Sequence, residues 1–235
     1  MFKFKSQLLK LVLSVTALSI SMQLFAGRPM HVDDASVVDA KSCQLEMWMQ
    51  KHADDREYWS IPACNFGSNF ELALGMGRTD TDQADPQNYA VLQGKTLLKA
   101  LETNSWGIGL VSGSQFNVND STDQIWYTSV PVSLSIMDDA FIVHANLGWS
   151  HEKQDHRNFF TWGVGSETQV APRLALTTEL YGNDRKESFV QTGFRYMLRK
   201  DRIQLDTSYG KQLQRSKQSD FFSLGLVLYS SALLP

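Results

Sequence analysis

Hydrophobic and polar residues alternate over most of the chain after residue 43, and the pattern is clearest between residues 160 and 181. There the sequence reads FTWGVGSETQV, then a short link at Ala171–Arg173, then LALTTELY. Large apolar residues such as Phe160, Trp162 and Val164 take every second position, with Thr or Gly between them. Successive side chains of a pleated strand leave opposite faces, so this period of two predicts a hairpin with one apolar face.

The same alternation recurs along the chain and predicts about twelve strands. Most approach the roughly 9–11 residues that a tilted transmembrane strand needs. An even number of strands lets an antiparallel sheet close on itself without exposed edges. We therefore expect an all-β fold, an antiparallel up-and-down transmembrane β-barrel of about 12 strands. Besides the hairpin, the predicted strands are Cys43–Gln50, Tyr58–Ala63, Phe70–Gly77, Tyr89–Ala100, Trp106–Ser114, Ile125–Met137, Phe141–Ser150, Val190–Leu198, Ile203–Tyr209 and Phe222–Tyr229.

The segments between these strands fall into two alternating sets. One set is short and the other is generally longer and more polar, as in outer-membrane barrels, which have short turns at one end and longer loops at the other. Both termini are then expected on the short-turn side, with the longer loops facing the cell exterior. The short set is Asn65–Ser68, Leu101–Ser105, Met137–Ala140, Val170–Arg173 and Arg199–Arg202; the long set is Lys51–Glu57, Arg78–Asn88, Gln115–Gln124, His151–Asn158, Gly182–Glu187 and Lys211–Asp220.

The two faces of the predicted strands differ in chemistry. The apolar face is expected to contact lipid, and the polar face is expected to converge on an enclosed lumen. Charged pairs across a narrow lumen either brace the wall or line a constriction that selects solutes, and both alternatives stay open. The lipid-facing candidates include Phe160, Trp162, Val164, Leu174, Leu176, Leu205, Leu224 and Leu226. The lumen-lining candidates are Glu46, Glu71, Lys95, Lys99, His144, Glu167, Glu179, Arg195 and Asp206.

The N-terminus has the pattern of a secretory signal: a basic start, an apolar run from Leu8 to Phe25, and the small residue Ala26. We expect a signal peptide over 1–26, a periplasmic lead-in segment over 27–42, and the barrel over 43–235. Cleavage after Ala26 removes three lysines and changes the formal net charge from −3 to −6. An acidic mature chain argues against nucleic-acid binding. The expected location is the outer membrane of a Gram-negative bacterium.

The two cysteines, Cys43 and Cys64, flank the first predicted hairpin in the exported part of the chain. In an oxidising compartment such a pair forms a disulfide. Two thiols without further ligands do not make a zinc site. We therefore expect one structural disulfide and no metal.

Three motifs suggest chemistry but are incomplete. Gly94-Lys95-Thr96 lacks the earlier glycine of a phosphate-binding loop, and the histidines of His151-Glu152 and His156 are spaced one residue too far apart for a zinc protease helix. His144 shares a predicted face with nearby serines, Ser133 and Ser135, but no nucleophile elbow is present. We expect a structural histidine, no cofactor and no enzymatic activity.

The start of the mature chain resembles a known group of bacterial proteins. The matching features are Arg28-Pro29, Asp33-Asp34-Ala35, Cys43 with Glu46, Trp59, Pro62 with Cys64-Asn65, and Glu71-Leu72 before Gly75. They resemble outer-membrane transporter-like β-barrels related to the family named after the MetA pathway of phenol degradation. The resemblance covers about the first quarter of the mature chain, and it implies a barrel that passes small hydrophobic or aromatic compounds. The last residues, Leu233-Leu234-Pro235, depart from the aromatic ending common in such barrels.

Three functions are consistent with these observations. The first is a channel or transporter-like barrel for small solutes, hydrophobic or aromatic among them. The second is a non-conducting structural or assembly barrel whose lumen is filled by charged pairs and Gly27–Lys41. The third, disfavoured because no convergent catalytic set is visible, is a barrel-embedded lipid-modifying enzyme. The expected partners are outer-membrane lipid, a small-molecule solute and, during insertion, the barrel-assembly machinery.

Overall fold

The computed structural model describes residues 27–67, 69–81, 84–213 and 220–234, and these residues form twelve β-strands. Residues 1–26, on which the predicted signal peptide falls, lie outside the described residues. Within the described ranges no helix is long and apolar enough to cross a bilayer. The strands are β1 (Cys43–Lys51), β2 (Asp55–Asn65), β3 (Phe70–Thr81), β4 (Ala84–Lys99), β5 (Trp106–Asn117), β6 (Gln124–Ile136), β7 (Phe141–Glu152), β8 (Arg157–Ala171), β9 (Leu174–Asn183), β10 (Ser188–Arg199), β11 (Ile203–Gln212) and β12 (Phe221–Tyr229).

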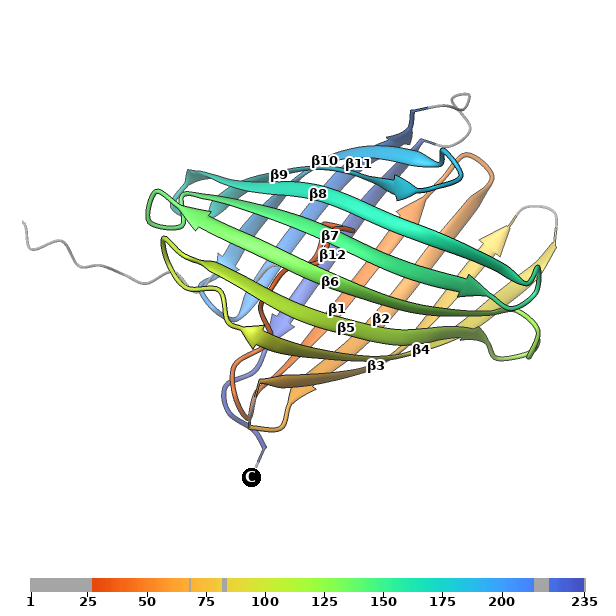
Figure 1. Cartoon of the computed structure of the whole chain (residues 1–235), viewed down its shortest axis with the longest axis horizontal. Coiled ribbons are helices and arrows are strands. Elements are labelled where there is room, and N and C mark those ends of the chain that lie inside the picture. The colour runs from red at the N-terminus through yellow and green to blue at the C-terminus, as the bar shows by residue number, and fades with distance from the viewer. Residues whose placement is uncertain (1–26, 68, 82–83, 214–219, 235) are drawn as a thin grey trace, which may run out of the picture.

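The strands form one closed barrel in which each strand pairs with its sequence neighbours (Figure 1). The last strand returns to the first, and the antiparallel pairing of β1 with β12 sets Met47 opposite Leu226. This closure leaves no sheet edge exposed, and it confirms the predicted antiparallel barrel.

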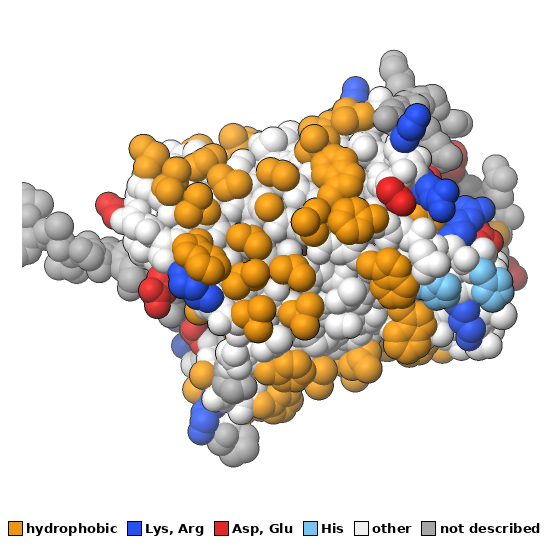
Figure 2. Space-filling model, viewed as in Figure 1, with side chains coloured by type: hydrophobic (Ala, Val, Ile, Leu, Met, Phe, Trp, Pro, Cys, Tyr) orange, Lys and Arg blue, Asp and Glu red, His pale blue; other side chains and the backbone are white. Residues whose placement is uncertain are grey.

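The outer wall is apolar over a broad band (Figure 2). Phe160, Val164, Leu205 and Leu224 are exposed, although all four are large hydrophobic residues. In water such an apolar surface would be unfavourable, whereas in a bilayer it contacts the lipid tails. Trp106, Trp126 and Trp149 are also exposed on this face.

The loops at one end are shorter than predicted. The segment Arg78–Asn88 was expected to be a loop, but β3 continues to Thr81, β4 begins at Ala84, and Arg78 pairs with Asn88. Polar strands that project beyond the apolar band do not need a hydrophobic face, so backbone pairing persists after the hydrophobic alternation has stopped. We call the end with connections 52–54, 118–123, 153–156 and 184–187 the loop end, and the end with 100–105, 137–140, 172–173 and 200–202 the turn end.

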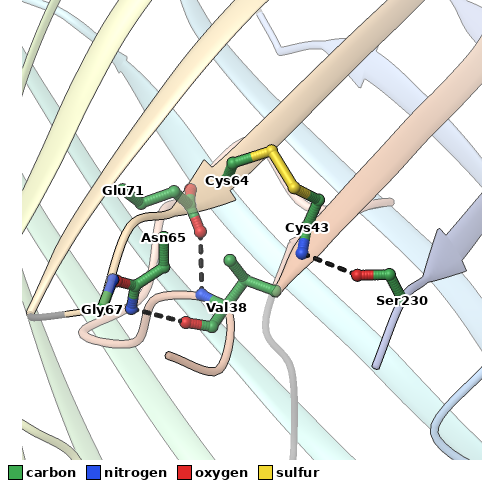
Figure 3. Close-up of a disulfide and its surroundings, with 7 residues drawn as sticks. All are labelled: Val38, Cys43, Cys64, Asn65, Gly67, Glu71 and Ser230. Carbon is green, nitrogen blue, oxygen red and sulfur yellow. Dashed lines mark hydrogen bonds between the residues drawn. A yellow bond between two sulfur atoms is a disulfide. The ribbon is translucent and has the colours of Figure 1, made fainter. Parts of the chain in front are cut away.

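The predicted disulfide is present at the turn end. Cys43 and Cys64 are directly opposite each other in the pairing of β1 with β2, with their Cα atoms 4.1 Å apart. The backbone N–H of Cys43 donates to Ser230 Oγ at 2.8 Å, just beyond the end of β12 (Figure 3). The disulfide therefore lies beside the seam where the barrel closes.

Candidate functional site in the barrel lumen

Residues 27–42, predicted as a lead-in segment, enter the barrel and run inside it over 27–38, and we call residues 27–42 the plug (Figure 1). Val32, Ala35 and Val38 of the plug are buried although none belongs to the wall. Proline and the irregular sequence exclude a regular strand here, so the backbone groups of the plug need partners other than a sheet ladder. Inward-facing side chains of the wall supply them.

Near the turn end, the plug is bound by β2 and β3. The backbone N–H of Val38 donates to Glu71 Oε2 at 2.8 Å, and Val38 O accepts from Asn65 Nδ2 at 2.8 Å (Figure 3). Asn65 O in turn accepts from the N–H of Lys41 at 2.8 Å. Both backbone groups of Val38 are thus satisfied by side chains of the wall.

The middle of the plug is bound by a buried cation and an amide. Lys95 Nζ lies 2.6 Å from Asp33 Oδ1 and also contacts Asp34. Asn146 brackets the backbone of Asp33, because its Oδ1 accepts from the N–H at 2.6 Å and its Nδ2 donates to the carbonyl at 2.8 Å. Asn146 lies on β7 and Lys95 on β4, so the plug spans the lumen between distant strands.

A carboxylate of β9 binds the adjacent residues of the plug, His31 and Val32. Glu179 accepts from the backbone N–H of His31 and from that of Val32, the latter at 2.7 Å. The neighbouring strand β8 approaches the plug closely: a Cβ added to Gly163 would lie 2.7 Å from Val32 Cγ2. Glycine is required there because the plug occupies the space of a side chain.

The N-terminal end of the plug meets two arginines. Arg195 donates to the carbonyls of Gly27 and Arg28, at 3.0 and 3.1 Å. Arg28 Nη2 lies 3.2 Å from Asp206 Oδ1, and its guanidinium carbon lies 4.6 Å from the centre of the Trp48 ring. Planar guanidinium groups suit such sites because they donate several hydrogen bonds and stack on aromatic rings.

A chain of buried polar groups connects two parts of the plug through the wall. The N–H of Ala35 donates to Ser133 Oγ at 2.9 Å, and Ser133 Oγ lies 2.8 Å from His144 Nδ1. His144 Nε2 lies 3.4 Å from one oxygen of Glu167, whose other oxygen accepts from Arg195 at 2.5 Å. Serine, histidine and acid also compose hydrolase triads. Here, however, Ser133 and His144 are 0 % exposed, and the hydroxyl of Ser133 already accepts from the plug. In this conformation these polar groups hold the plug.

Beyond the plug, towards the loop end, aromatic rings face the lumen. Trp48 and Trp59 stack with ring centres 5.9 Å apart, and Trp59 continues to Tyr89 at 6.2 Å. On the other side His31 of the plug stacks on Tyr181 at 4.2 Å, and Tyr181 on Phe189 at 5.4 Å. The rings of the wall are half-buried, unlike the buried polar groups around the plug. The aromatic lining is defined as Trp48, Trp59, Tyr89, Tyr127, Tyr181 and Phe189.

The chain matches the family described as "Uncharacterised conserved protein UCP029691" over residues 14–228. It belongs to this family. No curated protein sequence matches the chain.

Three solved structures resemble this chain. The KdgM porin has a TM-score of 0.63 at 8 % identity, covering 80 % of this chain and 99 % of that one. The NanC porin has a TM-score of 0.60 at 10 % identity, covering 79 % and 98 %. An outer membrane channel from Pseudomonas putida F1 has a TM-score of 0.58 at 10 % identity, covering 86 % and 100 %. The fold is therefore that of Gram-negative outer-membrane barrels. It agrees with the outer-membrane location predicted from the sequence.

The structure places eight of the nine lumen candidates on the inner face. Glu71, Lys95, His144, Glu167, Glu179, Arg195 and Asp206 are buried there, and Glu46 is half-buried. Lys99 is the exception and a correction. A register shift between Leu97 and Lys99 sets Lys99 opposite the outward-facing Ile108, and its Nζ lies 4.1 Å from the centre of the Trp106 ring. One extra residue in the strand reverses the faces that follow it.

Sequence reasoning did not identify the aromatic lining or the residues of the plug that bind the wall. The lining was detectable, because Tyr127 and Tyr181 occupy the polar parity of their strands. Arg28, Asp33 and Asp34 follow no period, so nothing in their spacing predicted their partners. Among the motifs, Lys95 is a strand residue paired with the plug, and His151 Nδ1 lies 3.1 Å from Asn158 Oδ1 at the loop end.

A small cluster at the loop end contains His52, Asp55 and Glu57. Their ligand-type atoms lie within 4.8 Å of one another, which is close enough to hold a metal ion. Ion pairs account for the same arrangement, because His52 Nε2 lies 3.8 Å from Asp55 Oδ1 and 3.6 Å from Glu57 Oε1. The hydrogen bond to Glu57 raises the pKa of His52 above its usual value.

Proposed function

We propose that this protein is a gated outer-membrane channel, in which the plug closes the lumen and the aromatic lining receives a small aromatic solute. The observation that carries the proposal is the position of the aromatic lining next to the plug, with His31 stacked on Tyr181. Aromatic rings favour other flat rings in stacked contact. A solute that stacks on Tyr181 would compete with His31 for the same ring.

The charges around the plug favour neutral solutes over acidic ones. The KdgM porin has been solved in complex with disordered oligogalacturonate. In the present lumen the buried acids outnumber the buried bases, so a polyanion would meet a repulsive field. The buried acids are Asp34, Glu71, Glu167, Glu179 and Asp206, and the buried bases are Arg28, Lys95 and Arg195.

Several of the residues that resemble the phenol-degradation barrels lie in the plug and at its binding sites on the wall. Arg28, Asp33 and Asp34 belong to the plug, and Glu71 is one of its receptors on the wall. The motif residues therefore support a shared plug. We include the relation to that family, and its preference for small aromatic compounds, in the proposal.

The same proposal extends to the export and membrane insertion of the chain. Residues 1–26 are proposed as a cleaved signal peptide. The exposed apolar wall is proposed to contact outer-membrane lipid, and insertion is proposed to use the barrel-assembly machinery. No catalytic step is proposed.

A non-conducting barrel is the second candidate, and it is favoured by the density of polar contacts on the plug. Paired buried charges are costly to separate, so a plug held by Lys95 and Arg195 could remain in place permanently. Conductance distinguishes the two candidates. Deletion of residues 27–38, which keeps the link to β1, should produce steady current in planar bilayers under either candidate. The proposed channel also requires brief openings of the wild-type protein.

The solute class is tested with two ligands of similar size. Phenyl glucoside presents a flat ring, whereas cyclohexyl glucoside presents a saturated one. We expect phenyl glucoside to bind more tightly, measured by quenching of tryptophan fluorescence, and to pass more quickly into liposomes that contain the protein. Equal binding of the two glucosides would contradict an aromatic preference. Absence of wild-type openings would support the non-conducting barrel.

A further inference from the structure

Gly27 lies inside the lumen and not at the barrel mouth. Its carbonyl accepts from Arg195 Nη2 at 3.0 Å, and a Cβ added to it would lie 2.6 Å from Glu46 Oε1. The backbone nitrogen is attached to the same Cα, so it lies within about 5 Å of that oxygen by standard backbone dimensions. A side chain at this position would require the flexible Glu46 side chain to move.

The surroundings of Glu46 are short of positive charge. Arg28, Glu71 and Asp206 act electrostatically on Glu46, two acids and one base, and the backbone of Arg28 also interacts with it. Arg28 is already committed, because its Nη2 contacts both Asp206 and Ser223. A half-buried carboxylate that shares its cation with another acid is stabilised less than one with a cation of its own. Arg195, which donates to the carbonyl of Gly27, is paired with Glu167, so neither arginine is paired with Glu46 alone.

We propose that Glu46 is the binding site for the processed N-terminus of this chain, the α-ammonium group of Gly27. Hydrolysis of the Ala26–Gly27 peptide bond by a signal peptidase consumes one water and leaves a carboxylate on Ala26 and an ammonium on Gly27. In the uncut chain the same nitrogen is a neutral amide. Cleavage thus creates a cation beside the carboxylate, and it completes the docking of the plug.

This inference explains why glycine opens the mature chain. A Gly terminus brings its ammonium against Glu46 without a Cβ that would displace the carboxylate, whereas a longer terminus moves the charge away. The inference depends on cleavage after Ala26 but not on conduction, so it stands or fails independently of the proposed channel.

The test compares two termini in two backgrounds. One protein begins at Gly27, and the other carries two additional alanines before Gly27. Each is made with Glu46 and with Glu46→Gln, and all four are refolded and checked for the heat-dependent gel shift of a closed barrel. Hydrogen exchange of the backbone amides of His31 and Val32, read by mass spectrometry, reports plug docking.

With Glu46 present, the extension should accelerate this exchange roughly tenfold, a typical coupling between contacting charges. In the Glu46→Gln background the extension should have little further effect. Glu71→Gln is the matched control: it removes another plug-binding carboxylate, at Val38, and the extension should still accelerate exchange. An equal effect of the extension with Glu46 and with Gln, or a mature terminus other than Gly27 in protein purified from membranes, would overturn the proposal.

Discussion

The two halves of the lumen solve different problems with different side chains. Towards the turn end, buried charged and amide groups bind the plug either directly, as Glu71 and Lys95 do, or through Arg195, as Glu167 does. Towards the loop end, the rings of the aromatic lining stack on one another and remain half-exposed. Polar groups with fixed partners give one well-defined arrangement, whereas stacked rings accept any flat ligand. The difference separates closure from recognition.

His31 and Tyr181 are the point where the two halves meet. The backbone N–H of His31 donates to Glu179, which holds the plug, and the ring of His31 stacks on Tyr181 of the aromatic lining. A ligand on the lining and the docking of the plug are therefore coupled through one residue. The predictions below alter one half at a time.

The largest effect is expected from Lys95→Met, which removes the buried partner of Asp33 and Asp34. Removal of one member of a buried ion pair costs about 3–5 kcal/mol, because the other charge is left uncompensated. The plug should undock, with rapid hydrogen exchange over residues 31–38. Lys99→Met is the control on the same strand, because Lys99 lies outside against Trp106. Similar exchange in the two variants would show that the ion pair does not hold the plug.

Gly163→Ala tests the fit between plug and wall without changing a charge. The new methyl would lie 2.7 Å from Val32 Cγ2, and such overpacking costs about 1–3 kcal/mol. Exchange should accelerate at Val32 while the barrel keeps its thermal transition. Val164→Ala, next along β8 but on the outer face, should leave the plug unchanged. Identical exchange in Gly163→Ala and wild type would mean that the plug has room to move at this point.

Trp59→Leu alters the recognition half alone. Loss of a stacked aromatic pair costs about 0.5–1.5 kcal/mol, so the affinity for phenyl glucoside should fall by a factor of roughly 2–10. Titration followed by the remaining tryptophan fluorescence measures it. Trp149→Leu, on the outer face, serves as the control. Faster plug exchange in Trp59→Leu would contradict the separation of the two halves.

The smallest effect concerns His52 at the rim of the loop end. The groups that face it are Asp55, Glu57 and the amide of Gln50. Because Glu57 raises the pKa of His52 in the folded state, the ion pairs stabilise the fold fully below the unfolded pKa of about 6.5. That stability is lost as the pH rises through the folded pKa. The change in melting temperature between pH 5.5 and pH 8.5 should shrink in His52→Gln, and an unchanged pH dependence would exclude His52 as its source.

The barrel was predictable because a bilayer imposes a strict rule on each strand separately. Phe160, Trp162 and Val164 must all face lipid, so period two is written into every strand and can be read without knowing its neighbours. The same local rule fails at Lys99, where one inserted residue reverses the faces. It also fails at Arg78–Asn88, where strands outside the bilayer no longer need an apolar side.

The plug was not predictable in the same way, because its partners are distant in sequence. Glu179 appears in the sequence only as an acid on a polar face, and nothing local indicates that it accepts from His31 and Val32. The candidate lumen residues were found by parity. Their roles required the three-dimensional arrangement.

The contacts at the beginning of the plug have a consequence for the order of folding. Arg28 binds Asp206 and Ser223, which are 178 and 195 residues away along the chain. Contacts so far apart carry a large loop-closure cost and form late. Arg28 must therefore wait for β11 and β12 before it can dock, whereas Val38 can dock earlier, because its partner Glu71 is only 33 residues away. Once Arg28 has docked, the earliest part of the chain is held by the latest.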